Sequence, residues 1–71
     1  MNNARRNQIR AIQKQIRDIR SELEDILSDE MDNYESMISD AQKDASEEAQ
    51  TAMEDAVYSL EEASESLEEV L

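Results

Sequence analysis

The 71-residue sequence contains no glycine, proline, cysteine or histidine, and its only aromatic residues are two tyrosines. Without cysteine the chain cannot form disulfides. Without cysteine and histidine it lacks the usual ligands of zinc, iron and copper. Glycine and proline mark most turns, and a small β-sheet protein would need several glycines with positive φ. Their absence argues against a β fold, and the abundance of Glu, Ala, Leu, Ile and Gln favours helix.

The chain is also short and lacks long apolar segments. Seventy-one residues allow one small domain, which usually needs well-packed helices or oligomerisation to be stable. No apolar run approaches the ~20 residues of a membrane-spanning helix, and no apolar signal-peptide segment follows the basic N-terminus. We therefore expect a cytoplasmic protein. A net charge of −12 with 37% charged residues would also suit a disordered chain. The periodicity of the apolar residues distinguishes a helical fold from disorder.

Apolar residues in the N-terminal half follow a heptad pattern, with spacings that alternate between three and four. They are Ile9, Ile12, Ile16, Ile19, Leu23 and Ile26. The pattern then shifts by one residue, as in a coiled-coil stutter, and continues through Leu27, Met31, Tyr34 and Met37 or Ile38. This half is predicted to be one amphipathic helix.

The C-terminal half repeats the heptad pattern beside a row of alanines. The repeat runs through Met53, Val57, Leu60, Ser64, Leu67 and Leu71. Residues 39–48 between the halves contain no large apolar side chain, and Ser39 with Gln42 fits a capping box. Asp44 with Glu47 offers a second helix start. We predict one domain over residues 1–71, with a helix at 3–38, a turn at 39–44 and a helix at 45–71; the alternative is a single helix about 105 Å long.

Charge supports the folded-back arrangement. Residues 1–20 hold six bases and one acid, a net charge of +5, whereas residues 54–71 hold seven acids and no base. Each end therefore opposes the dipole of its own helix, and an antiparallel pairing turns this conflict into attraction. The sequence predicts an all-α fold, a two-helix antiparallel coiled-coil hairpin that aligns Ile12 with Leu67, Ile19 with Leu60 and Leu23 with Val57. Dimerisation into a four-helix bundle would cover Met31, Tyr34, Val57, Tyr58 and Val70, which we expect outside the narrow seam.

The sequence offers no arrangement that suits catalysis or cofactor binding. Catalytic carboxylates need a pocket that shifts their pKa, and a thin hairpin does not provide one. Residues 28–32 lack the spacing and the glycine of a calcium loop. We interpret the basic residues at positions 5–20 as partners of the acidic C-terminus. We therefore expect a protein that is not an enzyme, with no metal site, no direct nucleic-acid binding and no membrane contact.

The acidic central segment is the main functional feature. Residues 21–53 carry eleven acids and one base, Lys43, for a net charge of −10. Folded at the turn, this segment would be a rod with one net negative charge per ~2.5 Å, compared with ~1.7 Å for duplex DNA. This density predicts an acidic decoy that binds a basic, nucleic-acid-binding protein. The predicted partner-binding residues are Glu24, Asp25, Asp29, Asp32, Glu35, Asp44, Glu47 and Glu48. The alternative is a structural coiled-coil module that self-associates or packs on a partner helix.

Three segments carry a resemblance to a known group: residues 1–6, 21–37 (SELEDILSDEMDNYESM) and 52–71 (AMEDAVYSLEEASESLEEVL). Together they resemble small uncharacterised acidic helical proteins of Firmicutes and their phages, which also begin Met-Asn-x-x-Arg-Arg and end in repeated Leu-Glu-Glu blocks. Those proteins have a proline and often a glycine near the turn, where this chain has Ile38 and Thr51. The resemblance implies a phage or mobile-element setting, and it implies no catalytic residues.

Overall fold

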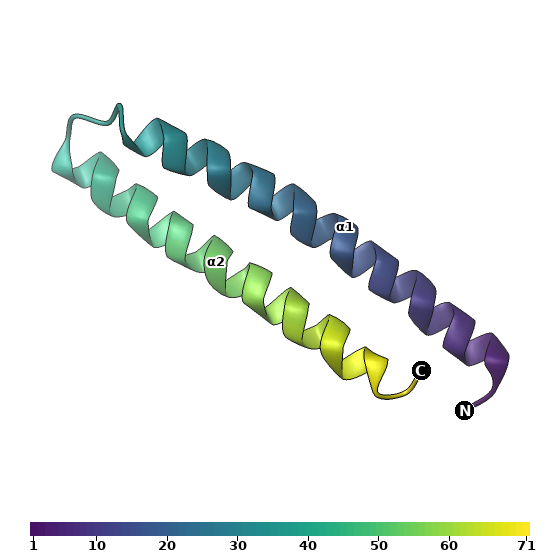
Figure 1. The fold of residues 1–71 in the computed structure, drawn as a ribbon. Helices are drawn as coiled ribbons and strands as arrows, with labels where there is room; N and C mark the ends of the chain where they lie inside the picture. Colours follow the sequence, from purple (N-terminus) through teal and green to yellow (C-terminus); the bar gives the residue numbers. More distant parts are fainter.

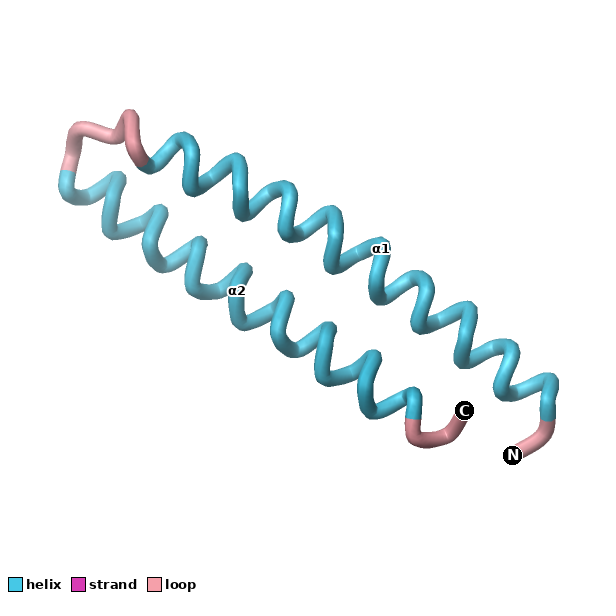
Figure 2. The backbone as a smooth tube through the Cα atoms, viewed as in Figure 1, coloured by secondary structure: helices cyan, strands magenta, loops and turns pink.

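The computed structural model describes residues 1–71 as two α-helices, α1 (Asn3–Tyr34) and α2 (Asp40–Glu68), without strands (Figure 1). The helices lie side by side and antiparallel, so both termini are at the same end (Figure 2). The hairpin measures 56 × 15 × 10 Å. A single helix of this length would extend over about 105 Å. The predicted all-α hairpin is therefore confirmed, and the single long helix is excluded.

Side-chain caps define the start of each helix. The side chain of Asn2 accepts a hydrogen bond from the backbone N–H of Arg5 at 2.9 Å, and Ser39 Oγ accepts one from the N–H of Gln42 at 3.0 Å. Both bonds satisfy backbone donors that the first turn of a helix leaves free. The predicted cap at Ser39 is confirmed. The connection needs no glycine because no residue adopts a positive φ.

The turn lies earlier in the chain than predicted, and the predicted helix bounds of 3–38 and 45–71 are wrong there. α1 ends at Tyr34 and α2 begins at Asp40. Met37 folds back and is half-buried, whereas Ile38 is 92% exposed. The cap at Ser39 starts α2 at once, so the polar stretch that we assigned to a turn forms the first turns of a helix. Residues 40–44 lack large apolar side chains because they form a polar part of α2, and not because they form a turn.

The contact between the helices forms a seam with unbroken heptad spacing. On α1 and the turn, the half-buried or buried positions are Arg6, Ile9, Gln13, Ile16, Arg20, Leu23, Leu27, Glu30, Tyr34 and Met37. On α2 and its C-terminal end, seam residues are Lys43, Ser46, Gln50, Met53, Val57, Leu60, Ser64, Leu67 and Leu71. The predicted heptad of the C-terminal half is confirmed. Half of the heptad predicted for the N-terminal half is wrong. Ile12, Ile19 and Ile26 lie outside the seam and are 47%, 52% and 56% exposed.

The error arose because α1 contains two overlapping heptad patterns. Both include Ile9, Ile16 and Leu23; one adds three isoleucines, and the other adds Gln13, Arg20 and Leu27. Only the second pattern keeps its phase as far as Met37, so no stutter is needed. The hydrophobic content of the first pattern was greater, but continuity along the whole helix determines which face can stay in contact with α2.

Two polar residues of the seam, Gln13 and Arg20, are paired across it. Gln13 is 2% exposed, and its Nε2 donates to the Ser64 carbonyl at 3.1 Å and to Glu68 Oε1 at 3.2 Å. Arg20 Nη1 donates to Glu61 Oε1 at 3.3 Å. These contacts place the two helices at about the predicted level, but the predicted pairs Ile12–Leu67 and Ile19–Leu60 are wrong because both isoleucines lie outside the seam. The only buried residues are Gln13 and Ser46, and no hydrophobic side chain is fully covered.

Candidate functional site

One broad side of the hairpin is lined by charge, and we call it the charged face. It comprises Arg10, Arg17, Glu24 and Met31 on α1 and Glu47, Glu54, Glu61 and Glu68 on α2. Each of these residues follows a seam residue by one position, so both rows lie on the same side of the antiparallel pair. The contacts of Gln13 with Glu68 and Arg20 with Glu61 identify this side directly.

The opposite broad side is the apolar face, formed by residues that precede a seam residue by one position. It comprises Ile12, Ile19 and Ile26 on α1 and Ala49, Ala56, Ala63 and Val70 on α2. None of the seven carries a charge. The three isoleucines were predicted to lie inside the hairpin, so this surface was not predicted from the sequence.

The eight predicted partner-binding residues are all exposed in the half of the rod nearest the turn, but they do not form one cluster. Helical phase places Glu24, Glu35, Asp44 and Glu47 on or beside the charged face. Asp25 and Asp32 point outward from α1, and Glu48 points outward from α2. Asp29 lies toward the apolar side. The carboxylates therefore surround the rod, and no three of them are arranged to hold a metal ion.

Arg20 reduces the negative charge at one edge of this acidic surface. Its Nε lies 3.4 Å from Glu24 Oε1, and its Nη1 lies 3.3 Å from Glu61 Oε1. The three side chains are 35%, 49% and 44% exposed, so solvent screens both ion pairs. Glu24, one of the predicted partner-binding residues, is therefore partly neutralised by Arg20, which occupies the seam one turn away.

Tyr34 joins α1 to α2 close to the turn. Its hydroxyl donates to Glu47 Oε1 at 2.6 Å. This hydrogen bond, together with desolvation and the negative charges of Glu47 and Asp44, raises the pKa of Tyr34 above its ordinary value. The bond favours the neutral phenol because a phenolate could not donate it. Tyr34 thus connects the helices, and it uses one of the predicted binding carboxylates to do so.

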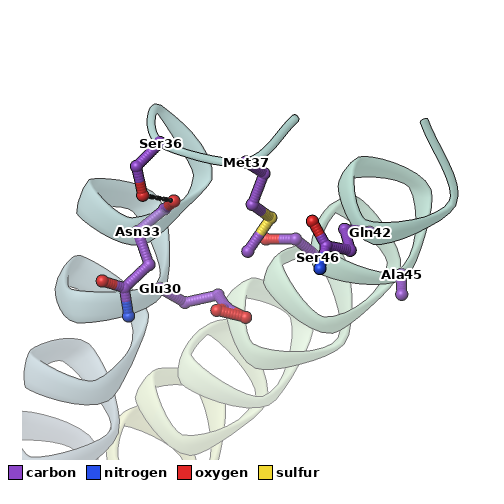
Figure 3. A pocket seen from close by; sticks show the side chains of 7 residues that line it. All are labelled: Glu30, Asn33, Ser36, Met37, Gln42, Ala45 and Ser46. Carbon is purple, nitrogen blue, oxygen red and sulfur yellow. Dashed lines mark hydrogen bonds between the residues drawn. The ribbon is translucent and has the colours of Figure 1, made fainter. Parts of the chain in front are cut away.

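Shallow depressions are the only concave features of the surface. At the turn, Glu30, Met37 and Ser46 line a gap between the helices with Gln42 (Figure 3). Ser36 Oγ donates to the Asn33 carbonyl at 2.8 Å beside it, which closes the end of α1. A second depression along α2 is lined by Asp44, Glu47, Glu48, Thr51, Ala52 and Asp55. These open surfaces can contact another macromolecule, but none desolvates a carboxylate.

Comparison of the chain with protein-family models, curated proteins and solved structures gave no match. Neither helix contains a segment of the length and apolar character needed to cross a membrane. The functional reading of this chain therefore depends on the chemistry of its two faces and of the acidic half of the rod.

Proposed function

We propose that this chain is a non-enzymatic interaction protein that binds a basic, nucleic-acid-binding protein and occupies its groove in place of DNA or RNA. A phage-type inhibitor of a host nuclease or defence protein is the activity that fits this surface. The proposal rests on charge density and shape, since both helices contribute carboxylates to one narrow rod.

The observation that carries the proposal is the exposure of charge in the turn half, which we define as residues 21–53. Ten of its eleven acids are exposed; Glu30, in the seam, is the exception. Its one base, Lys43, is half-buried in the seam. The acids surround a rod with a cross-section of 15 × 10 Å, and a groove lined by Arg and Lys could therefore contact carboxylates on both walls at once.

The rigidity of the scaffold supports the same function. A flexible acidic tail would lose entropy on binding, whereas here the carboxylates are fixed on two helices that Tyr34 and Glu47 join. The resemblance to small acidic proteins of Firmicutes phages agrees with an inhibitory role, because such a chain must act through its surface.

A charge-removal variant tests the proposal. Proteins captured from a bacterial lysate by the wild type would be identified by mass spectrometry, and the binding isotherm of the captured partner measured at about 50 and about 200 mM salt. Replacing Asp29, Asp32 and Glu35 by Asn, Asn and Gln should weaken binding and flatten its salt dependence. The matched control is Glu62→Gln, Glu65→Gln and Glu69→Gln, which removes three exposed charges from the other end of the rod.

The two variants separate specific from general charge effects. Equal weakening by both would show that only net charge matters. Unchanged affinity of the first variant at both salt concentrations would eliminate the decoy and leave a structural coiled-coil module as the function. The sequence predicted that such a module would use Met31, Tyr34, Val57, Tyr58 and Val70; in the structure Val57 lies in the seam, Met31 lies on the charged face, and Val70 lies with Ile12, Ile19 and Ile26 on the apolar face.

A further inference from the structure

The apolar face has the pattern of a helix surface that packs against a second neighbour. A two-stranded coiled coil needs apolar residues only along its seam, whereas helices of a larger bundle add a third apolar row beside it. Ile12, Ile19 and Ile26 form such a row at seven-residue spacing, each about half exposed. Alanines form the matching row on α2, where small side chains allow close approach of another helix.

We infer that two copies of this chain pack their apolar faces together as an antiparallel four-helix bundle, with the two-fold axis beside Ile19. The first helix of each copy lies against the first helix of the other. Ile19 then meets its own symmetry mate, and Ile12 meets Ile26 of the second copy. This inference does not depend on the acidic decoy proposal.

A second copy would supply apolar burial that the single hairpin lacks. A single hairpin buries no hydrophobic side chain fully, and small two-helix chains are marginally stable alone. A second copy would cover Ile12, Ile19 and Ile26 on each chain. None of the residues of the apolar face carries a charge that this contact would bury.

The charges of α1 favour the antiparallel direction over the parallel one. Residues 1–20 of α1 carry net +5, whereas residues 21–35 carry seven acids and no base. Antiparallel packing of α1 on α1 places each positive segment against a negative one. With parallel packing, the two turn halves, each of net charge −10, would instead lie side by side. The charged face cannot form this dimer because both copies would present Glu47, Glu54, Glu61 and Glu68.

The first experiment measures mass by analytical ultracentrifugation over a range of concentrations. The wild type should sediment at twice its 8.2 kDa mass. Replacing Ile12, Ile19 and Ile26 together by Gln, a good helix former, should raise the dimer dissociation constant by at least about 100-fold, since three buried contacts are lost. The control Met31→Gln with Tyr58→Gln removes exposed apolar groups elsewhere and should leave the dimer unchanged.

The second experiment tests direction by disulfide crosslinking. The chain has no cysteine, so Ile19→Cys introduces a single thiol that lies beside its mate only in the antiparallel dimer. Oxidation should convert most of this variant into a crosslinked dimer, whereas Met31→Cys on the charged face should remain largely monomeric on a denaturing gel. Helicity by circular dichroism checks that each variant is folded.

Defined outcomes would overturn the inference. A wild-type chain that stays monomeric, or a dimer that the three glutamines do not weaken, would exclude the apolar face as the interface. A dimer in which Ile19→Cys crosslinks only to Ala56→Cys or Ala63→Cys of a second copy would show parallel packing, and the antiparallel arrangement would be wrong. A wild-type chain that dimerises but captures no protein from the lysate would contradict the proposed decoy function alone.

Discussion

The apolar face and the charged face consist of residues only two positions apart in the heptads of the same two helices, yet they differ in almost every property. On the charged face, glutamates recur every seven residues along α2, and three of them accept hydrogen bonds from Gln13, Arg20 and Tyr34. On the apolar face, isoleucines and alanines recur at the same spacing and make no polar contact. Two positions correspond to a rotation of about 200° around the helix axis, so the two kinds of surface lie on opposite sides of the hairpin.

The charged face and the apolar face therefore have different roles in the hairpin. The charged face contributes directional contacts that hold α1 and α2 in one register, because a shift of the helices would break several polar pairs at once. The apolar face contributes little to the isolated hairpin, since its isoleucines remain half exposed. It is therefore the surface on which substitution should alter association more than folding.

The largest expected difference in the free energy of unfolding is between alanine substitutions of two isoleucines one turn apart. Ile16→Ala in the seam should reduce the free energy of unfolding by about 2 kcal/mol at any protein concentration. Ile19→Ala on the apolar face should cost less than about 1 kcal/mol in dilute protein, and more at high concentration if the dimer forms. Urea unfolding followed by circular dichroism at two concentrations measures both. Equal costs in dilute protein would place Ile19 in the core.

Loss of the buried amide should have the next largest effect. Gln13→Ala removes the bonds to the Ser64 carbonyl and Glu68, and should reduce the free energy of unfolding by about 1–2 kcal/mol. Gln15→Ala, at an exposed position of the same helix, is the control and should be nearly neutral. Chemical denaturation of the two variants measures the difference. A neutral Gln13→Ala would mean that its bonds contribute nothing to the register.

Removal of the ion pairs of Arg20 should have a smaller effect. Because all three side chains are more than a third exposed, Arg20→Gln should cost about 0.5 kcal/mol or less, and added salt should remove most of that cost. Arg17→Gln changes the net charge equally without breaking an ion pair, so it is the matched control. Thermal unfolding at low and high salt compares them, and a cost that persists in high salt would contradict the screened-pair interpretation.

The smallest expected effect is a pH dependence from Tyr34. Its pKa is raised in the folded state by the bond to Glu47, so its contribution to stability is fully present below the unfolded value of about 10. The contribution is lost as pH rises through the folded-state value. The stability difference between wild type and Tyr34→Phe should thus stay constant at neutral pH and shrink above pH ~10. Tyr58→Phe is the control, and a difference that grows with pH would contradict the assignment.

The heptad predicted from the sequence was correct for α2, although the predicted start of that helix at residue 45 was wrong, and it was half wrong for α1. In the C-terminal half a single heptad pattern exists, from Met53 to Leu71, and the structure uses all of it. In the N-terminal half two patterns share Ile9, Ile16 and Leu23, and hydropathy favours the wrong one. The capping role of Ser39 was predicted because it depends on local hydrogen bonding alone. The end of α1 was not, because no glycine or proline marks it.

The sequence by itself determined the helical class, the antiparallel direction and the concentration of charge near the turn. These properties follow from residue composition, local periodicity and the opposite charges of residues 1–20 and 54–71. Only the tertiary structure decided which of the two heptad patterns in α1 faces α2. That choice depends on whether Gln13 and Arg20 find polar partners across the seam, and a buried polar group is stable only when such partners are within hydrogen-bonding distance. Once those partners are in place, the three isoleucines are left on the outside.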